Sequence, residues 1–133
     1  MTADRRIPLA LFLLRLGVFL VVVIWTLDKF VNPQHAARVF QKFYFIGGLG
    51  APAFYAVGGL ELLILLGFLV GYQKRVTCGA VLLLHGISTL ASFRMYLTPF
   101  PNLLYFAAWP MLAACFALYS LRDLDTKWVV AAG

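Results

Sequence analysis

The sequence predicts an all-α membrane protein: a four-helix transmembrane bundle, up-down-up-down, with a short amphipathic interfacial helix between the first two helices. Apolar residues make up 63% of the chain and charged residues only 12%, whereas a soluble domain has roughly 45–50% and 25%. A chain of 133 residues has too few charges here to cover a soluble surface. Its four apolar segments each reach the roughly 20 residues that cross a bilayer. We therefore expect one integral membrane domain over residues 1–133.

The first apolar segment covers about 7–31 and begins after Arg5 and Arg6, with Pro8 in a position suited to the first helical turn. The apolar run is about twice as long as the core of a signal peptide, and no cleavage-site pattern follows it. We therefore expect this segment to be a retained membrane helix.

The connection over 32–51 is the long one, and it begins with the helix-start signal Asn32-Pro33. The apolar positions within it share one helical face, and they are Ala36, Val39, Phe40, Phe43 and Tyr44. The polar side chains of Arg38, Gln41 and Lys42 fall elsewhere. This pattern predicts a short amphipathic helix at the membrane interface.

Three further spans are predicted at about 52–72, 76–97 and 103–121. The links between them are short, over 73–75 and 98–102, and short links make consecutive helices antiparallel neighbours.

The Lys and Arg residues near the helix ends predict the orientation of the bundle. One side holds Arg5, Arg6, Lys74, Arg75, Arg122 and Lys127, and the other holds Lys29, Arg38 and Lys42. This asymmetry predicts that both termini are cytoplasmic in a bacterial inner membrane. The net charge of +6 then reflects topology and contact with anionic lipid, so we expect no nucleic-acid partner.

The sequence shows no recognisable catalytic or metal-binding pattern. Cys78 and Cys115 form no CxxC pair and fall within apolar segments, where cysteine behaves as a small buried hydrophobe. No cluster of His, Cys and carboxylate residues has metal-ligand spacing, so we expect no metal. Catalytic residues cannot be named from these patterns.

Ionisable residues inside the apolar segments are the most informative ones, because each costs about 2.5–3.5 kcal/mol at mid-depth. Helical rise sorts them into two levels. An inner level contains Arg15, Glu61 and His85, and an outer level contains Asp28, Lys29 and Arg94. The inner residues are candidates for binding a polar headgroup or relaying a proton. The outer residues are candidates for an ion pair.

Specific pairs follow from these depths. We expect Arg15 to interact with Glu61 inside the bundle, with His85 close enough to share a water or ligand. We expect Asp28 to pair with Arg94 or Lys29. The alternative for each pair is a purely structural role, since a buried ion pair can hold helices together without chemistry.

Three motifs carry a resemblance to a known family. They are Leu14-Arg15-Leu16-Gly17, the run from Trp25 to Phe30 with Asn32-Pro33, and Gly58-Gly59-Leu60-Glu61-Leu62. On four short-linked helices, this pattern resembles the DoxX-like family of small four-helix bacterial membrane proteins. The resemblance covers nearly the whole chain and implies an association with redox or sulfur metabolism.

The function we expect is that of an integral subunit or accessory protein of a redox system, linked to quinone or sulfur chemistry. Quinone is the candidate cofactor, and the lipid bilayer, a larger membrane redox complex or a soluble redox enzyme are the candidate partners. One alternative is a small proton- or cation-coupled transporter that uses Glu61. Another is a structural subunit of a larger membrane complex, without chemistry of its own.

Overall fold

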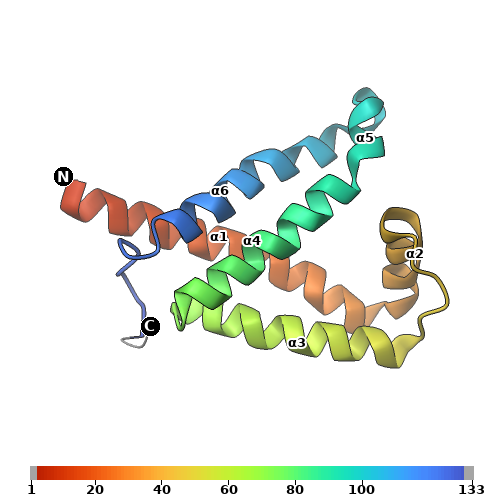
Figure 1. The fold of residues 1–133 in the computed structure, drawn as a ribbon, viewed down its shortest axis with the longest axis horizontal. Helices are drawn as coiled ribbons and strands as arrows, with labels where there is room; N and C mark the ends of the chain where they lie inside the picture. The colour runs from red at the N-terminus through yellow and green to blue at the C-terminus, as the bar shows by residue number, and fades with distance from the viewer. Residues whose placement is uncertain (1–2, 131–133) are drawn as a thin grey trace.

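A computed structural model describes residues 3–130, and every regular secondary-structure element in this part of the chain is a helix (Figure 1). The predicted all-helical fold is thereby confirmed. The elements are α1 (Ala3–Val31), α2 (Pro33–Tyr44), α3 (Ala51–Val70), α4 (Lys74–Ala91), α5 (Phe93–Leu97), the 3₁₀ helix η1 (Phe100–Ala107) and α6 (Ala108–Ser120).

Three helical stretches among the described residues are long and apolar enough to cross a membrane. They are Arg5–Val31, Ala51–Val70 and Phe100–Ser120, the last formed by η1 and α6 together. α4 has 18 residues and is not among them.

The prediction of one continuous helix over 76–97 is wrong, because the structure divides this stretch at Ser92 into α4 and α5. The Ser92 hydroxyl donates to the carbonyl oxygen of Ser88 at 3.0 Å, and Thr89 makes the same kind of bond to His85 at 2.7 Å. Such bonds from Ser and Thr to the preceding turn bend helices. They account physically for the interruption.

The long helices form two pairs that diverge toward one end (Figure 1). α1 packs on α3, α4 packs on α6, and α3 also packs on α4. The α3–α4 turn and the C-terminal segment lie at one end, hereafter the terminal end, and α2 and α5 lie at the other, hereafter the α2 end. The buried apolar core consists of Leu11, Val18, Leu65, Phe68, Cys78, Val81, Cys115 and Leu118.

α2 forms where the sequence predicts an amphipathic helix, and its apolar face turns toward the bundle. The Asn32 side chain accepts a hydrogen bond from the His35 backbone N–H, and Pro33 occupies the first turn. Ala36 is buried, and the Phe40 ring packs edge-on against Phe54 with centroids 5.1 Å apart. The helix therefore stands across the diverging end of the bundle.

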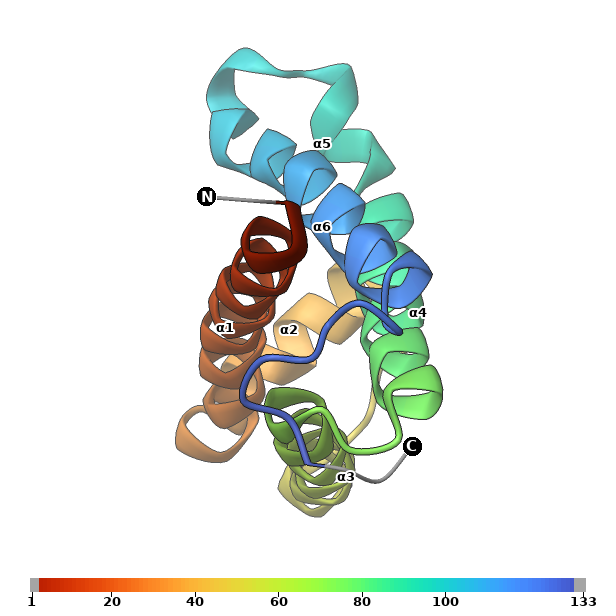
Figure 2. The same ribbon diagram turned by 90° about the vertical axis from the view of Figure 1, so that its left-hand side faces the viewer.

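The segment over 121–130, which follows the last predicted span, crosses the helix ends from α6 past α1 to α3 (Figure 2). The Val130 N–H donates to the Val70 carbonyl at 2.8 Å. Gly71 ends α3 with a φ of +72°, and a Cβ there would meet Val129. A close approach and a left-handed backbone both require glycine at this position.

Candidate functional site

Arg15 is the most completely buried charge of α1, with 1% of its surface exposed. Its Nη1 lies 2.6 Å from Oδ1 of Asp125, which is 0% exposed. Its Nη2 donates to the carbonyl oxygens of Lys127 at 2.7 Å and Trp128 at 3.1 Å. The guanidinium thus fastens the C-terminal segment to the first helix.

The contacts of Arg15 with Asp125, Lys127 and Trp128 are hereafter called the clamp. Lys74 adds a second cation to it, because its Nζ donates to the Asp125 carbonyl oxygen at 2.6 Å. One polar atom on each partner, Nε of Arg15 and Oδ2 of Asp125, is buried without a hydrogen-bond partner among the described residues. An ion pair removed from solvent in this way contributes little net stability, yet removing one partner is strongly destabilising.

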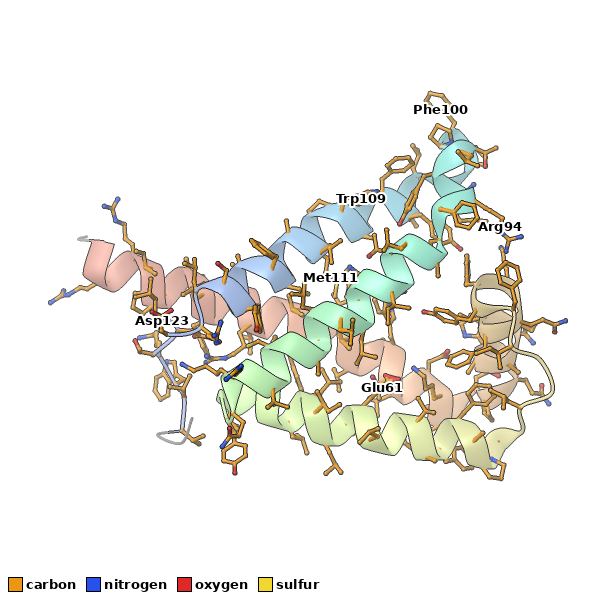
Figure 3. All side chains as sticks on the ribbon, in the orientation of Figure 1. Glu61, Arg94, Phe100, Trp109, Met111 and Asp123 are labelled. Carbon is orange, nitrogen blue, oxygen red and sulfur yellow. The ribbon has the colours of Figure 1, made fainter. Side chains whose placement is uncertain are left out.

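Glu61 lies on α3 and contacts the half of α1 that is farther from Arg15 (Figure 3). Its Oε1 lies 3.1 Å from Nζ of Lys29, and its Oε2 accepts from the Thr26 hydroxyl at 3.1 Å. The Lys29 and Glu61 side chains are 14% and 15% exposed. This contact joins α3 to the last third of α1.

The expected Arg15–Glu61 pair is therefore wrong. Arg15 finds Asp125 at the terminal end, and Glu61 finds Lys29 near the α2 end. Arg15 and Lys29, which is the partner of Glu61, lie more than three helical turns apart on α1. His85 shares a contact with neither of them and lies on the cavity described below.

The outer residues also pair differently from expectation. Asp28 bonds to Nδ1 of His35 at 2.5 Å, which ties the end of α1 to α2. Arg94 is exposed, donates to the Lys42 carbonyl and stacks over the Phe45 ring at 5.2 Å. The expected Asp28–Arg94 and Asp28–Lys29 pairs are therefore wrong, and both cations contact other groups.

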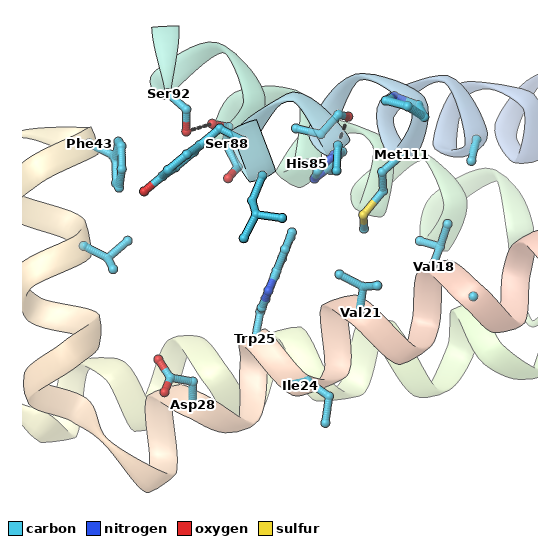
Figure 4. Close-up of a pocket in the computed structure, with 18 of the residues that line it drawn as sticks. Val18, Val21, Ile24, Trp25, Asp28, Phe43, His85, Ser88, Ser92 and Met111 are labelled. Carbon is cyan, nitrogen blue, oxygen red and sulfur yellow. Dashed lines mark hydrogen bonds between the residues drawn. The ribbon is translucent and has the colours of Figure 1, made fainter. Parts of the chain in front are cut away.

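A cavity of about 1280 Å³ lies between α1, α2, α4 and the η1–α6 stretch (Figure 4). Its walls are mostly aliphatic and aromatic side chains. Leu13 and Ile24 of α1 and Leu104 of η1 are exposed by 57%, 58% and 89% and belong to its rim. The cavity therefore opens sideways, toward whatever surrounds the bundle.

His85 lies on the α4 wall of this cavity and is 4% exposed. Its Nε2 is 3.1 Å from the Ala108 carbonyl oxygen, so this nitrogen carries the proton and donates. The Trp25 indole reaches across from α1 and stacks on the imidazole with centroids 6.0 Å apart. Nδ1 is buried without a hydrogen-bond partner among the described residues.

The remaining polar groups of the cavity gather toward the α2 end. Ser88 comes from α4 and Ser92 from the break between α4 and α5. Asp28 contacts His35 there, and Tyr105 comes from η1. An apolar cavity with a few placed polar groups is typical of a small-molecule site. Among the described residues, no group of three or more His, Cys, Asp and Glu side chains could hold a metal ion.

Asp125 and Trp25 were not predicted from the sequence as partners of the candidate residues. Asp125 follows the last apolar segment, in a stretch without periodicity, so nothing local indicated that it folds back. The useful signal was the small number of acidic residues. The chain has five, and a deeply buried Arg needs one of these carboxylates as its counter-charge.

Asp125→Asn should lower the free energy of unfolding by about 3–5 kcal/mol, because it leaves Arg15 buried without a counter-charge. The double variant Arg15→Leu, Asp125→Leu should lose much less. Unfolding of the purified protein in mixed micelles with increasing SDS would measure both. Asp123→Asn is the matched control, since Asp123 is exposed two residues earlier in the same C-terminal segment. If the double variant lost as much free energy of unfolding as the sum of the losses from its two single substitutions, the proposed interaction of Arg15 with Asp125 would be contradicted.

Comparison with known proteins gives no match for this chain. No family model matches it, and neither a curated protein nor a solved structure does. Its function must therefore be inferred from the geometry described above.

Proposed function

We propose that this protein binds an amphiphile in the cavity beside His85, as an integral subunit or accessory of a membrane redox system. The observation that carries the proposal is the laterally open apolar cavity, in which one deeply buried imidazole keeps a nitrogen that has no partner among residues 3–130. The resemblance of the Arg15, Asp28-Lys29 and Glu61 motifs to DoxX-like proteins supports the redox association.

The membrane arrangement we propose has four crossings, with α4 as the third, in a bacterial inner membrane. α4 is about 27 Å long at 1.5 Å per residue, close to the thickness of the hydrocarbon core. It is less apolar than the other three because it begins with Lys74 and Arg75 and carries the polar residues Thr77, His85 and Thr89, and these last three are buried within the bundle. Both termini are cytoplasmic in this proposal, as the distribution of Lys and Arg favours.

An amphiphile suits the cavity better than a hydrophilic solute does. Its aliphatic walls and exposed rim would lie within the bilayer, so a ligand can enter sideways from the lipid phase. The volume of about 1280 Å³ exceeds the 300–1,000 Å³ of typical small-molecule sites. An acyl or prenyl chain therefore fits along α1 while a headgroup meets His85.

Quinone is the candidate cofactor, and the residues present fit it. Trp25 offers a flat aromatic surface, and His85 and Ser88 offer polar contacts beside it. A bound quinone would supply two-electron redox chemistry. The protein's contribution would be to hold the ring, exclude water and place a hydrogen-bond acceptor, Nδ1 of His85, where the hydroxyl of the reduced ring can donate to it.

The two alternative functions receive less support from the geometry. A coupled transporter would need Glu61 on a pathway, but Glu61 is engaged by Lys29 and Thr26 and does not line the cavity. A structural subunit without chemistry remains a distinct outcome of the test below. In that case the cavity would hold only bulk lipid.

Gly17→Leu should abolish specific amphiphile retention, because Gly17 lines the cavity and a larger side chain would fill it. A Cβ at Gly17 meets nothing within 4 Å, so the variant should fold. The measurement is native mass spectrometry of the purified protein, followed by extraction and identification of bound lipid and quinone.

Gly59→Leu is the matched control, because a Cβ at Gly59 on α3 also meets nothing within 4 Å and Gly59 does not line the cavity. The parent and this control should keep a defined amphiphile that Gly17→Leu loses. Equal lipid content in all three proteins would favour the structural-subunit alternative and contradict amphiphile binding.

Cysteines placed at Gln34 and Asn102 should react with an impermeant maleimide added outside the cell, and one at Arg75 should not. This result is expected if α4 crosses the membrane and both termini are cytoplasmic. Native Cys78 and Cys115 are buried, and the parent protein gives the background. Labelling of Arg75→Cys and Asn102→Cys from the same side would show that α4 does not cross.

A further inference from the structure

We propose that the headgroup bound beside His85 is an uncharged hydroxyl that donates a hydrogen bond to Nδ1. This inference rests on the proposed amphiphile site and names the chemical class of its ligand. It follows from the charges lining the cavity, from the tautomer of His85 and from the neighbouring Trp25.

Ionic headgroups find no free counter-charge among the described residues that line the cavity. Asp28 is already bonded to Nδ1 of His35 at 2.5 Å, and no Arg or Lys is among these lining residues. The α1 cations Arg15 and Lys29 are already paired with Asp125 and Glu61. A phosphate or carboxylate beside His85 would therefore be buried without an Arg or Lys counter-charge, which is strongly unfavourable.

The tautomer of His85 makes Nδ1 an acceptor. Nε2 faces the Ala108 carbonyl oxygen at 3.1 Å and must hold the proton, so Nδ1 of the neutral ring has a lone pair and no hydrogen. A ligand carbonyl or ether has no hydrogen to offer this atom. A ligand hydroxyl has one, and the buried nitrogen gains the partner it lacks.

Trp25 supports the same ligand class. Its indole N–H is a donor only, and a hydroxyl is a small uncharged group that can accept from an N–H while donating to Nδ1. The serine and tyrosine hydroxyls of the cavity can rotate to donate or accept, so they do not discriminate. Because Nδ1 is covered, the ligand reaches it only when a side chain of the cavity wall moves.

The test uses Trp25 as the reporter. The chain has three tryptophans, and Trp109→Phe with Trp128→Phe leaves Trp25 alone. The full-length protein in lipid nanodiscs is titrated with a dibrominated eighteen-carbon alcohol or with its methyl ether, which quench indole fluorescence at short range. The alcohol should quench Trp25 at roughly five- to tenfold lower mole fraction than the ether, the ratio that one hydrogen bond supplies.

Two variants at position 85 assign that ratio to Nδ1. His85→Gln keeps an amide N–H that can reach the Ala108 carbonyl, but its acceptor oxygen is displaced from the position of Nδ1, so the alcohol should lose most of its advantage over the ether. His85→Asn places an amide oxygen near the position of Nδ1 and should restore part of the preference. If His85→Gln does not fold, the ratio in the parent and in His85→Asn decides.

The remaining outcomes separate this inference from the proposed function. Equal quenching by alcohol and ether, weakened for both by Gly17→Leu, would overturn the hydroxyl inference and leave amphiphile binding standing. Equal quenching that Gly17→Leu does not change would overturn both. Displacement of the brominated alcohol by a short-chain hydroquinone or by 1,2-dioctanoylglycerol distinguishes the two membrane sources of such a hydroxyl.

Discussion

A guanidinium inside an apolar bundle needs a counter-charge, and the partner of Arg15 shapes the whole terminal end. Asp125 enters the bundle to meet it, and the carbonyls of Lys127 and Trp128 complete its hydrogen bonds. The C-terminal segment must therefore cross beneath the helices, where Lys74 and Val70 fix it to α4 and α3. One buried ion pair thus links the first helix to the last residues described.

The same constraint operates at the α2 end with different partners. Lys29 and Glu61 join α1 to α3, and Asp28 and His35 join α1 to α2. These contacts hold α1 to α3 and α2, while α4 and α6 diverge from them and leave the cavity between. The ion pairs are structural in this account, and His85 is the inner candidate residue that faces the cavity.

The sequence was sufficient for the features that depend on local patterns. Apolar length predicted the long helices, and Asn32-Pro33 with its spaced apolar positions predicted α2. His85 was expected at mid-depth in the third span, and the structure buries it there. The break at Ser92 was not predicted, because it arises from hydroxyls that bond back to the preceding turn.

The pairing of charges could not be predicted because it depends on a contact across 110 positions. Depth along a helix limits which charges can meet, but it says nothing about a tail that folds back. Arg15 and Glu61 were plausible partners by depth until Asp125 was placed. The cavity was equally hidden, because it arises from the divergence of two helix pairs, and no single segment encodes that angle.

The most direct test of this account is the nitrogen-15 NMR spectrum of His85 in nanodiscs, before and after a long-chain alcohol is added. The chain has two histidines, so His35→Asn leaves the resonances of His85 alone. The account predicts a protonated Nε2 throughout and a bare Nδ1 whose resonance shifts as it accepts a hydrogen bond from the alcohol. A protonated Nδ1, or an Nδ1 resonance that the alcohol leaves unchanged, would contradict it.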